Sequence, residues 1–125
     1  MAFSERVKEL FEDFMRDFPH CSLLFLATSE GLPLWAEGAE GREEEFSAYS
    51  SSFISQTKEV LERLQLGQLR STLLVTDQGF FNLIPIDSSL TLGVVFKARS
   101  DYSRLFPMVK DLAERLRKLS EESGL

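Results

Sequence analysis

Hydrophobic and polar positions alternate along the chain in blocks that predict three helices. In the first, apolar residues recur every three or four positions from Phe3 to Phe18, with charged residues between them. A second amphipathic helix is predicted from Glu43 to about Gln65, and a third from about Leu105 to Leu119, with Pro107 in or near its first turn. We expect residues 119–125 to form a frayed tail.

Five other segments have the pattern of β-strands. Ser22–Thr28 is apolar at consecutive positions, which predicts a central strand covered on both faces. Leu32–Glu37 returns after a turn, and Pro33 indicates an edge position because proline cannot donate to a strand ladder. Short polar turns at 77–79 and 87–89 separate three further strands, which form a meander: Leu69–Thr76, Phe80–Ile86 and Leu90–Lys97.

The order of these elements predicts an α+β fold of the form α-β-β-α-β-β-β-α. We expect a five-stranded antiparallel sheet with helices on both faces, and one domain spanning residues 1–125. A chain of 125 residues is long enough to bury roughly two-thirds of its unfolded surface. It therefore needs no disulfide or metal to fold.

Composition and charge exclude several classes of function. The net charge of −6 opposes binding to nucleic acid, because phosphate contacts require clustered Lys and Arg. The single cysteine, Cys21, cannot form an intramolecular disulfide and is expected to be a small buried side chain. No segment resembles a signal peptide or a membrane span, which predicts a cytoplasmic protein without membrane insertion.

Candidate catalytic groups are few. His20 is the only histidine, which leaves no paired-histidine metal motif and makes a Ser-His or Cys-His catalytic pair hard to build. The glycines at 38 and 41 match no phosphate-binding loop. The acidic run 43–45 has two interpretations, a metal site or a solvated helix start beside the positive end of the helix dipole, and the second is favoured. We predict no enzyme, catalytic residue, metal or cofactor.

The second predicted helix has two unlike faces. Its apolar face consists of Phe46, Tyr49, Phe53, Thr57, Val60, Leu61 and Leu64. Small side chains gather on the other, at Ala48, Ser51, Ser52 and Ser55. Such a face either lets another backbone approach closely or is merely solvated, and the sequence leaves both readings open.

In the order and spacing of its patterns the chain resembles the Roadblock/dynein light-chain family, within the Roadblock and longin superfamily, from Val7 to Leu119. Four segments carry the resemblance: LLFLATSEGLPLWAEG (23–38), LERLQLGQL (61–69), TLLVTDQGFFNLIPI (72–86) and LTLGVVF (90–96). The resemblance implies a Roadblock/profilin-like fold. The family has no invariant catalytic motif, so the resemblance implies no catalytic residue either.

The resemblance also implies a dimer, formed with a second copy or with a homologue. Third strands would pair edge to edge into one continuous sheet, and second helices would pack side by side. A long apolar edge is a liability in a monomer, and dimerisation would cover it. The interface residues expected on this basis are Ala48, Ser51, Ser52, Ser55, Leu69, Ser71, Leu73 and Val75.

Bacterial relatives in the family regulate Ras-like GTPases, so the resemblance implies a GTPase-binding regulator or scaffold. Glu40, Arg42, Glu59 and Glu62 are the expected contacts, because an acidic surface can steer a basic partner. A small-molecule sensor of similar five-stranded architecture is the alternative, with Trp35 and Tyr49 as candidate pocket residues. The strands carry few polar residues at positions expected to be buried, which favours a filled core over an internal pocket.

Overall fold

The described part of the chain folds as the sequence pattern predicts, with three helices and five strands in the expected order. The computed structural model describes residues 2–97 and 101–124. The helices are α1 (Phe3–Asp17), α2 (Glu43–Arg63) and α3 (Tyr102–Ser123). The strands are β1 (Cys21–Thr28), β2 (Pro33–Glu37), β3 (Thr72–Thr76), β4 (Gly79–Pro85) and β5 (Leu90–Lys97).

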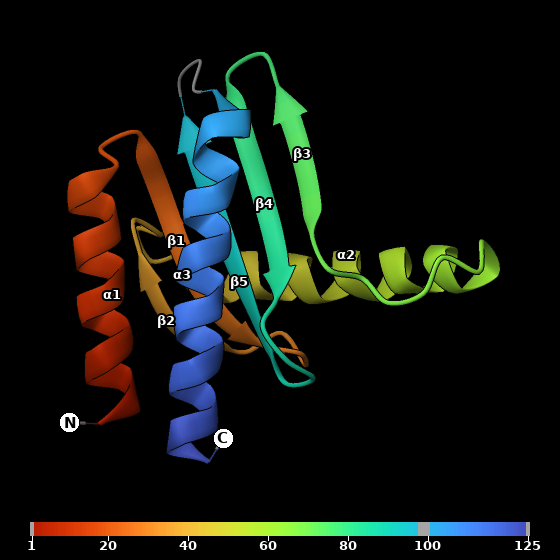
Figure 1. Cartoon of the computed structure of the whole chain (residues 1–125), viewed down its shortest axis with the longest axis horizontal. Helices are drawn as coiled ribbons and strands as arrows, with labels where there is room; N and C mark the ends of the chain where they lie inside the picture. Colours follow the sequence, from red (N-terminus) through yellow and green to blue (C-terminus); the bar gives the residue numbers. More distant parts are fainter. Residues whose placement is uncertain (1, 98–100, 125) are drawn as a thin grey trace.

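All five strands belong to one antiparallel sheet in the order β2-β1-β5-β4-β3. The β1–β2 hairpin and the β3–β4–β5 meander come from separate parts of the chain and are joined where β1 pairs with β5. Helices α1 and α3 lie side by side on one face of the sheet, and α2 crosses the other face (Figure 1). The prediction of helices on both faces is therefore confirmed, and β2 and β3 are the two edges.

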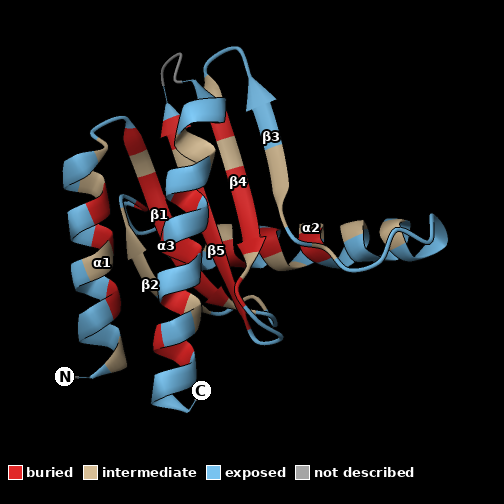
Figure 2. Ribbon diagram, viewed as in Figure 1, coloured by how far each residue is buried: buried red, intermediate tan, exposed pale blue. Residues whose placement is uncertain are grey.

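Two hydrophobic cores lie on opposite faces of the sheet. In β1, Leu24 and Leu26 point into the larger core beneath α1 and α3, whereas Phe25 and Ala27 point into the smaller core on the α2 side. All four side chains are buried, which confirms the central strand expected from its unbroken apolar run. Figure 2 shows this burial concentrated in β1, β5 and β4.

Gly93 in β5 leaves space for a side chain of the smaller core. It pairs with Phe25 of β1, and a β-carbon at position 93 would overlap the Phe25 ring. The ring lies over the glycine, with Phe46 and Phe81 at centroid distances of 6.4 and 6.3 Å. A glycine within a strand here marks a close approach of a neighbouring side chain.

The C-terminal end differs from the expectation of a frayed tail over residues 119–125. Helix α3 continues to Ser123, and Leu119 and Ser120 are buried. The Ser120 hydroxyl donates a 3.1 Å hydrogen bond to the Asp87 carboxylate in the β4–β5 turn, which fixes the last turns of the helix against the sheet. Residue 125 lies outside the described residues. Pro107 lies in the second turn of α3, one turn later than its favoured position.

Candidate interaction site

Helix α2 is supported by the sheet along only half of its length. Its buried residues, Ser47, Ser50 and Ile54, all lie in the first twelve positions, where the helix packs over β1 and β2. Its C-terminal half extends past the β3 end of the sheet, and almost all of residues 58–66 are exposed (Figures 1 and 2). We call residues 56–66, which comprise the end of the helix and the residues that follow it, the α2 arm.

The supported half sits close to the β1–β2 turn. Ser51 Oγ donates a 2.8 Å hydrogen bond to the Ser29 carbonyl oxygen, and a β-carbon on Gly31 would lie 3.1 Å from Ser51 Cβ and 3.4 Å from Ala48 Cα. Gly31 has a φ of +91°, which favours glycine. The backbone that approaches this part of the helix thus belongs to the same chain, and only small side chains at 48 and 51 allow it.

The small-residue face predicted from sequence is therefore divided. Ser51 is partly covered by the turn, whereas Ala48, Ser52 and Ser55 are exposed. These three positions follow one another along one side of the helix, at spacings of four and three. Their surface is open to a partner, but Ser51 is already occupied within the chain.

The apolar face of α2 is the less expected surface. Tyr49, Val60 and Leu64 are 65%, 55% and 60% exposed, although the pattern predicts an inward-facing stripe. Phe53 is only partly buried. For Val60 and Leu64 the cause is the position of the helix, because they lie beyond the point where this chain has strands to cover them. Tyr49 lies in the supported half, but there the helix turns Ser47, Ser50 and Ile54 toward the sheet and leaves Tyr49 at the groove. Exposed apolar stripes of this kind mark protein interaction sites.

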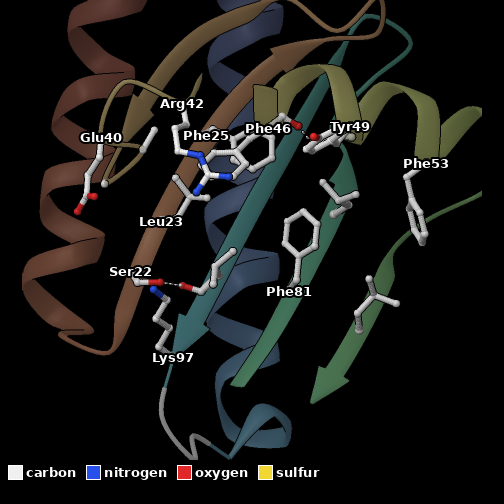
Figure 3. Close-up of a pocket in the computed structure, with 16 residues that line it drawn as sticks. Ser22, Leu23, Phe25, Glu40, Arg42, Phe46, Tyr49, Phe53, Phe81 and Lys97 are labelled. Carbon is white, nitrogen blue, oxygen red and sulfur yellow. Dashed lines mark hydrogen bonds between the residues drawn. The ribbon is translucent and has the colours of Figure 1, made fainter. Parts of the chain in front are cut away.

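A groove of about 570 Å³ runs beside α2 on the same face of the sheet (Figure 3). Its floor is the part of the sheet that α2 leaves uncovered, and Phe46, Tyr49 and Phe53 line the helix side. The remaining apolar lining residues are Ala39 from the loop before α2 and six strand residues: Leu23, Phe25, Leu74, Phe81, Leu83 and Val95. The groove is thus mostly aliphatic and aromatic.

Polar groups lie at the end of the groove where α2 begins. Arg42 donates from Nε and Nη2 to the two Glu45 carboxylate oxygens, at 3.1 and 2.8 Å, and its guanidinium carbon lies 4.7 Å from the centroid of the Phe46 ring. The bond from Arg42 holds the pKa of Glu45 below its ordinary value. Glu40 lies in the same exposed loop, with a φ of +54°. Of the four partner contacts expected from sequence, Glu40 and Arg42 are therefore neighbours here.

The other two expected contacts, Glu59 and Glu62, lie on the α2 arm. Both are exposed, and Glu59 forms an ion pair with Arg63 at 3.7 Å. The structure thus separates the four residues into two groups, one at the start of α2 and one near its end. A single partner contacting both groups would have to span the length of the helix, about 30 Å at 1.5 Å per residue.

Strand β3 forms the edge next to the groove and pairs only with β4. It is shorter than the predicted Leu69–Thr76, because residues 69–71 run in irregular structure before the ladder begins at Thr72. Leu69 packs into the smaller core and Leu73 against the larger one. Among the four strand residues expected at a dimer interface, Val75 is exposed and the other three are partly buried.

The side chains that sequence analysis did not assign to an interface are Leu74, Phe81 and Val95, together with the outer part of the α2 stripe. Leu74 is exposed and lines the groove. One signal was present in the sequence. A helix of 21 residues is about 31 Å long, whereas five strands about 4.8 Å apart span roughly 19 Å. A helix running across the sheet must overhang it.

Two other candidate residues, Trp35 and Cys21, pack within the fold. Trp35 packs against the larger core and donates from Nε1 to Glu37 at 3.3 Å, so it does not line the groove. Burial raises the pKa of Cys21 to about 12, which leaves its thiol protonated.

Within residues 2–97 and 101–124, no group of three or more His, Cys, Asp or Glu side chains could hold a metal ion. No helix in that same part of the chain is long and apolar enough to cross a membrane.

Comparison with known proteins identifies the fold. No family model matches the sequence, and no curated protein matches it. Solved structures do match the fold. A Roadblock/LC7 domain from Streptomyces avermitilis has a TM-score of 0.79 and 19% identity, over 88% of this chain and 93% of that one.

Two further structures show a higher and a lower structural similarity to this chain. The gliding protein MglB from Thermus thermophilus has a TM-score of 0.85 and 16% identity, over 98% of this chain and 93% of that chain. LokiProfilin2, solved in complex with rabbit actin, has a TM-score of 0.58 and 12% identity, over 95% of this chain and 99% of that chain. The fold is the Roadblock/profilin-like fold, and the better agreement of these is with the Roadblock side of that group.

Proposed function

We propose that this chain, which has the Roadblock/LC7 fold, is a non-enzymatic dimeric module that binds and regulates a small Ras-like GTPase, with the cytoplasm as its expected location. Its fold neighbours include several MglB structures, and MglB is a GTPase-activating regulator of MglA. The observation that carries the proposal is the pairing, in one chain, of an overhanging apolar arm with an uncovered apolar groove.

The arm and the groove complement each other through a two-fold axis. In a two-fold symmetric dimer the same surface is used by both copies, so an arm that overhangs β3 of its own sheet lies over β3, β4 and β5 of its partner. The arm residues 56–66 are about 16 Å long, and three strands span about 10–14 Å with their side chains. Each arm would then cover the groove of the other copy.

This arrangement assigns the interface to residues along the α2 stripe and the groove. Val60 and Leu64 of one copy would pack on Leu74 and Phe81 of the other, and the open backbone edges of the two β3 strands would pair. Ala48, Ser52, Ser55 and Val75, the exposed members of the interface set expected from sequence, would lie on or beside the paired α2 helices and β3 strands. Ser51, Leu69, Ser71 and Leu73 support it from within their own chain.

The GTPase surface is proposed on the outward side of the paired α2 helices. In such a dimer the antiparallel helices bring the Glu40 and Arg42 loop of one copy near the arm of the other, which carries Glu59 and Glu62. The two separated groups then form one continuous polar surface that one partner can contact. The chain would act by rearranging catalytic groups of the GTPase itself, as its resemblance to the family implies.

A second candidate function is a small-molecule sensor, and the groove itself is the observation that favours it. A volume of about 570 Å³ falls within the usual range for ligand sites, and the lining is aromatic with Arg42 and Tyr49 near one end. The two functions differ in what occupies the groove. A second copy makes the groove unavailable, whereas a ligand requires it to stay open.

The proposal is tested in two steps with the full chain. Light scattering across a concentration series measures the mass, and a dimer is expected. The tagged protein is then used to capture partners from its native extract with GDP or with a non-hydrolysable GTP analogue, and retention of a small GTPase in one nucleotide state only is expected. A protein that is monomeric at all concentrations would refute the proposed dimer. A dimer that retains no GTPase in either nucleotide state would refute the proposed role as a GTPase regulator.

A further inference from the structure

Asn82 is a polar residue in the middle of the apolar strand β4. It is fully buried, and the ladder places it between Leu73 of β3 and Val94 of β5. An aliphatic side chain would suit this position, because both cross-strand neighbours are aliphatic. The asparagine therefore calls for an explanation of its own.

Its amide ties down the segment that connects α2 to β3. Asn82 Nδ2 donates two hydrogen bonds of 2.8 Å, one to Ser71 Oγ and one to the Thr72 carbonyl oxygen. Across residues 2–97 and 101–124, the bond to Ser71 is the only side-chain hydrogen bond that joins residues 64–71 to the rest of the fold. Leu69 adds an apolar contact with the smaller core. The connection of the arm to the sheet depends on these two anchors.

The asparagine is retained at a cost. Its Oδ1 is buried and has no hydrogen-bond partner, and the same holds for Thr72 Oγ1. Unpaired buried acceptors destabilise a fold, so a leucine of similar shape would avoid the penalty at position 82. Buried polar residues kept in apolar surroundings are best known for fixing register, as the asparagines of coiled coils do.

We infer that Asn82 is a positioning residue that fixes both the register of β3 and the direction of the α2 arm. If β3 slipped by two residues along β4, the amide would lose both Ser71 and Thr72, and Leu74 would move along the edge. The same two bonds hold the β3 end of the connection, and the other end of this short connection joins the arm at Leu66. This inference rests on the proposed function in one respect, since arm and edge matter to partners only if the chain dimerises.

The positioning itself is tested by a distance within one chain. Spin labels are attached at Glu62→Cys on the arm and Lys118→Cys on α3, both exposed positions, and Cys21 stays unlabelled because it is buried. The labelled protein is diluted into an excess of unlabelled protein, so that each label pair is alone in its complex. A single narrow distance distribution is expected, which Asn82→Leu broadens or shifts. An unchanged distribution in the leucine variant overturns the inference.

A matched control separates positioning from general loss of stability. Thr91→Val removes another buried polar side chain, from β5, and Thr91 pairs with Ala27 and Pro85, away from the connection. Its distance distribution should equal that of the parent. If Asn82→Leu does not fold by circular dichroism, Ser71→Ala carries the test, because it removes one of the two acceptors from a partly exposed position. An unchanged distribution in that variant also overturns the inference.

The consequence for assembly is measured separately. In Asn82→Leu the dimer dissociation constant is expected to rise at least about tenfold, while Thr91→Val leaves it unchanged. A parent protein that is monomeric refutes the proposed dimer but leaves the distance measurement valid. A dimer whose affinity is equal in parent and Asn82→Leu, with a changed arm distance, refutes the link between positioning and assembly.

Discussion

Ser51 donates a 2.8 Å hydrogen bond to the carbonyl oxygen of Ser29, and this bond fastens α2 to the β1–β2 turn. It joins the supported half of the helix to the sheet from which the arm projects. Ser51→Ala should lower the free energy of unfolding by about 0.5 kcal/mol, because the Ser29 carbonyl loses its donor but is exposed and can accept from water instead. Ser51→Arg should cost more, about 2 kcal/mol or above, since Gly31 and Ala48 leave no space for a long side chain.

Urea unfolding of both variants measures these changes. Ser52→Arg is the control, because residue 52 is exposed and makes none of these contacts. A Ser51→Arg protein as stable as Ser52→Arg would contradict the close packing of α2 on the turn.

Leu64→Lys should convert the proposed dimer to a monomer without lowering the stability of the fold. Leu64 is 60% exposed on the arm, so a lysine there costs the monomer little. In the dimer the same lysine would be placed against the partner's apolar groove. Light scattering at several concentrations measures the mass of the variant.

The control for this prediction is Leu32→Lys, at an equally exposed leucine beside the opposite edge strand β2. It should remain dimeric. Loss of the dimer in both variants, or in neither, would count against the arm-in-groove interface.

Gly93→Ala should destabilise the protein by about 1–3 kcal/mol, the range for overpacking a filled core. The added methyl group would overlap the Phe25 ring, which is itself fully buried. Phe25→Leu in the same chain should recover part of the loss, because the smaller side chain frees space above residue 93. Thermal unfolding of the single and double variants tests this, and additive losses would contradict the proposed contact.

The Asp87 carboxylate should make stability depend on pH in the acid range. Burial alone would raise its pKa, but hydrogen bonds from Ser89, Ser120 and Leu90 outweigh this effect and hold the pKa below its ordinary value. A carboxyl whose pKa is lowered by folding contributes stability above its unfolded pKa of about 3.9. That contribution disappears as the pH falls through the lower folded value.

Unfolding of the parent and of Asp87→Asn should therefore differ most near neutral pH and converge below about pH 4. Ser120→Ala should reduce the difference, because it removes one of the bonds that lower the pKa. A constant difference between parent and Asp87→Asn from neutral to strongly acid pH would show that the ionised carboxylate contributes nothing.

Much of the fold follows from local pattern. The unbroken apolar run of β1 predicts a strand buried on both faces, and Leu24 and Phe25 are indeed buried on opposite sides. Pro33 predicts an edge, and β2 is an edge strand. These features depend on spacing and on backbone chemistry, both of which are local properties of the chain.

The candidate site is predicted less well from the sequence. The periodicity of α2 correctly groups Phe46, Tyr49 and Phe53 on one face, but it does not say which part of that face the sheet covers. The same pattern continues through Val60 and Leu64, where the helix has left the sheet and the stripe is exposed. In the first half the buried residues are Ser47, Ser50 and Ile54, one position along from the predicted stripe, so its members line the groove and do not fill the core.

The sequence by itself determined the elements and their order, because these depend on residue type and on contacts between near neighbours. Tertiary structure alone decided that Ser51 faces Ser29, that Asn82 reaches Ser71, and that α2 overhangs β3. Each of these relationships joins parts of the chain well separated in sequence through the order β2-β1-β5-β4-β3. Side-chain periodicity specifies which face of a helix or strand is apolar. Only the assembled sheet specifies which part of that face is covered by other elements.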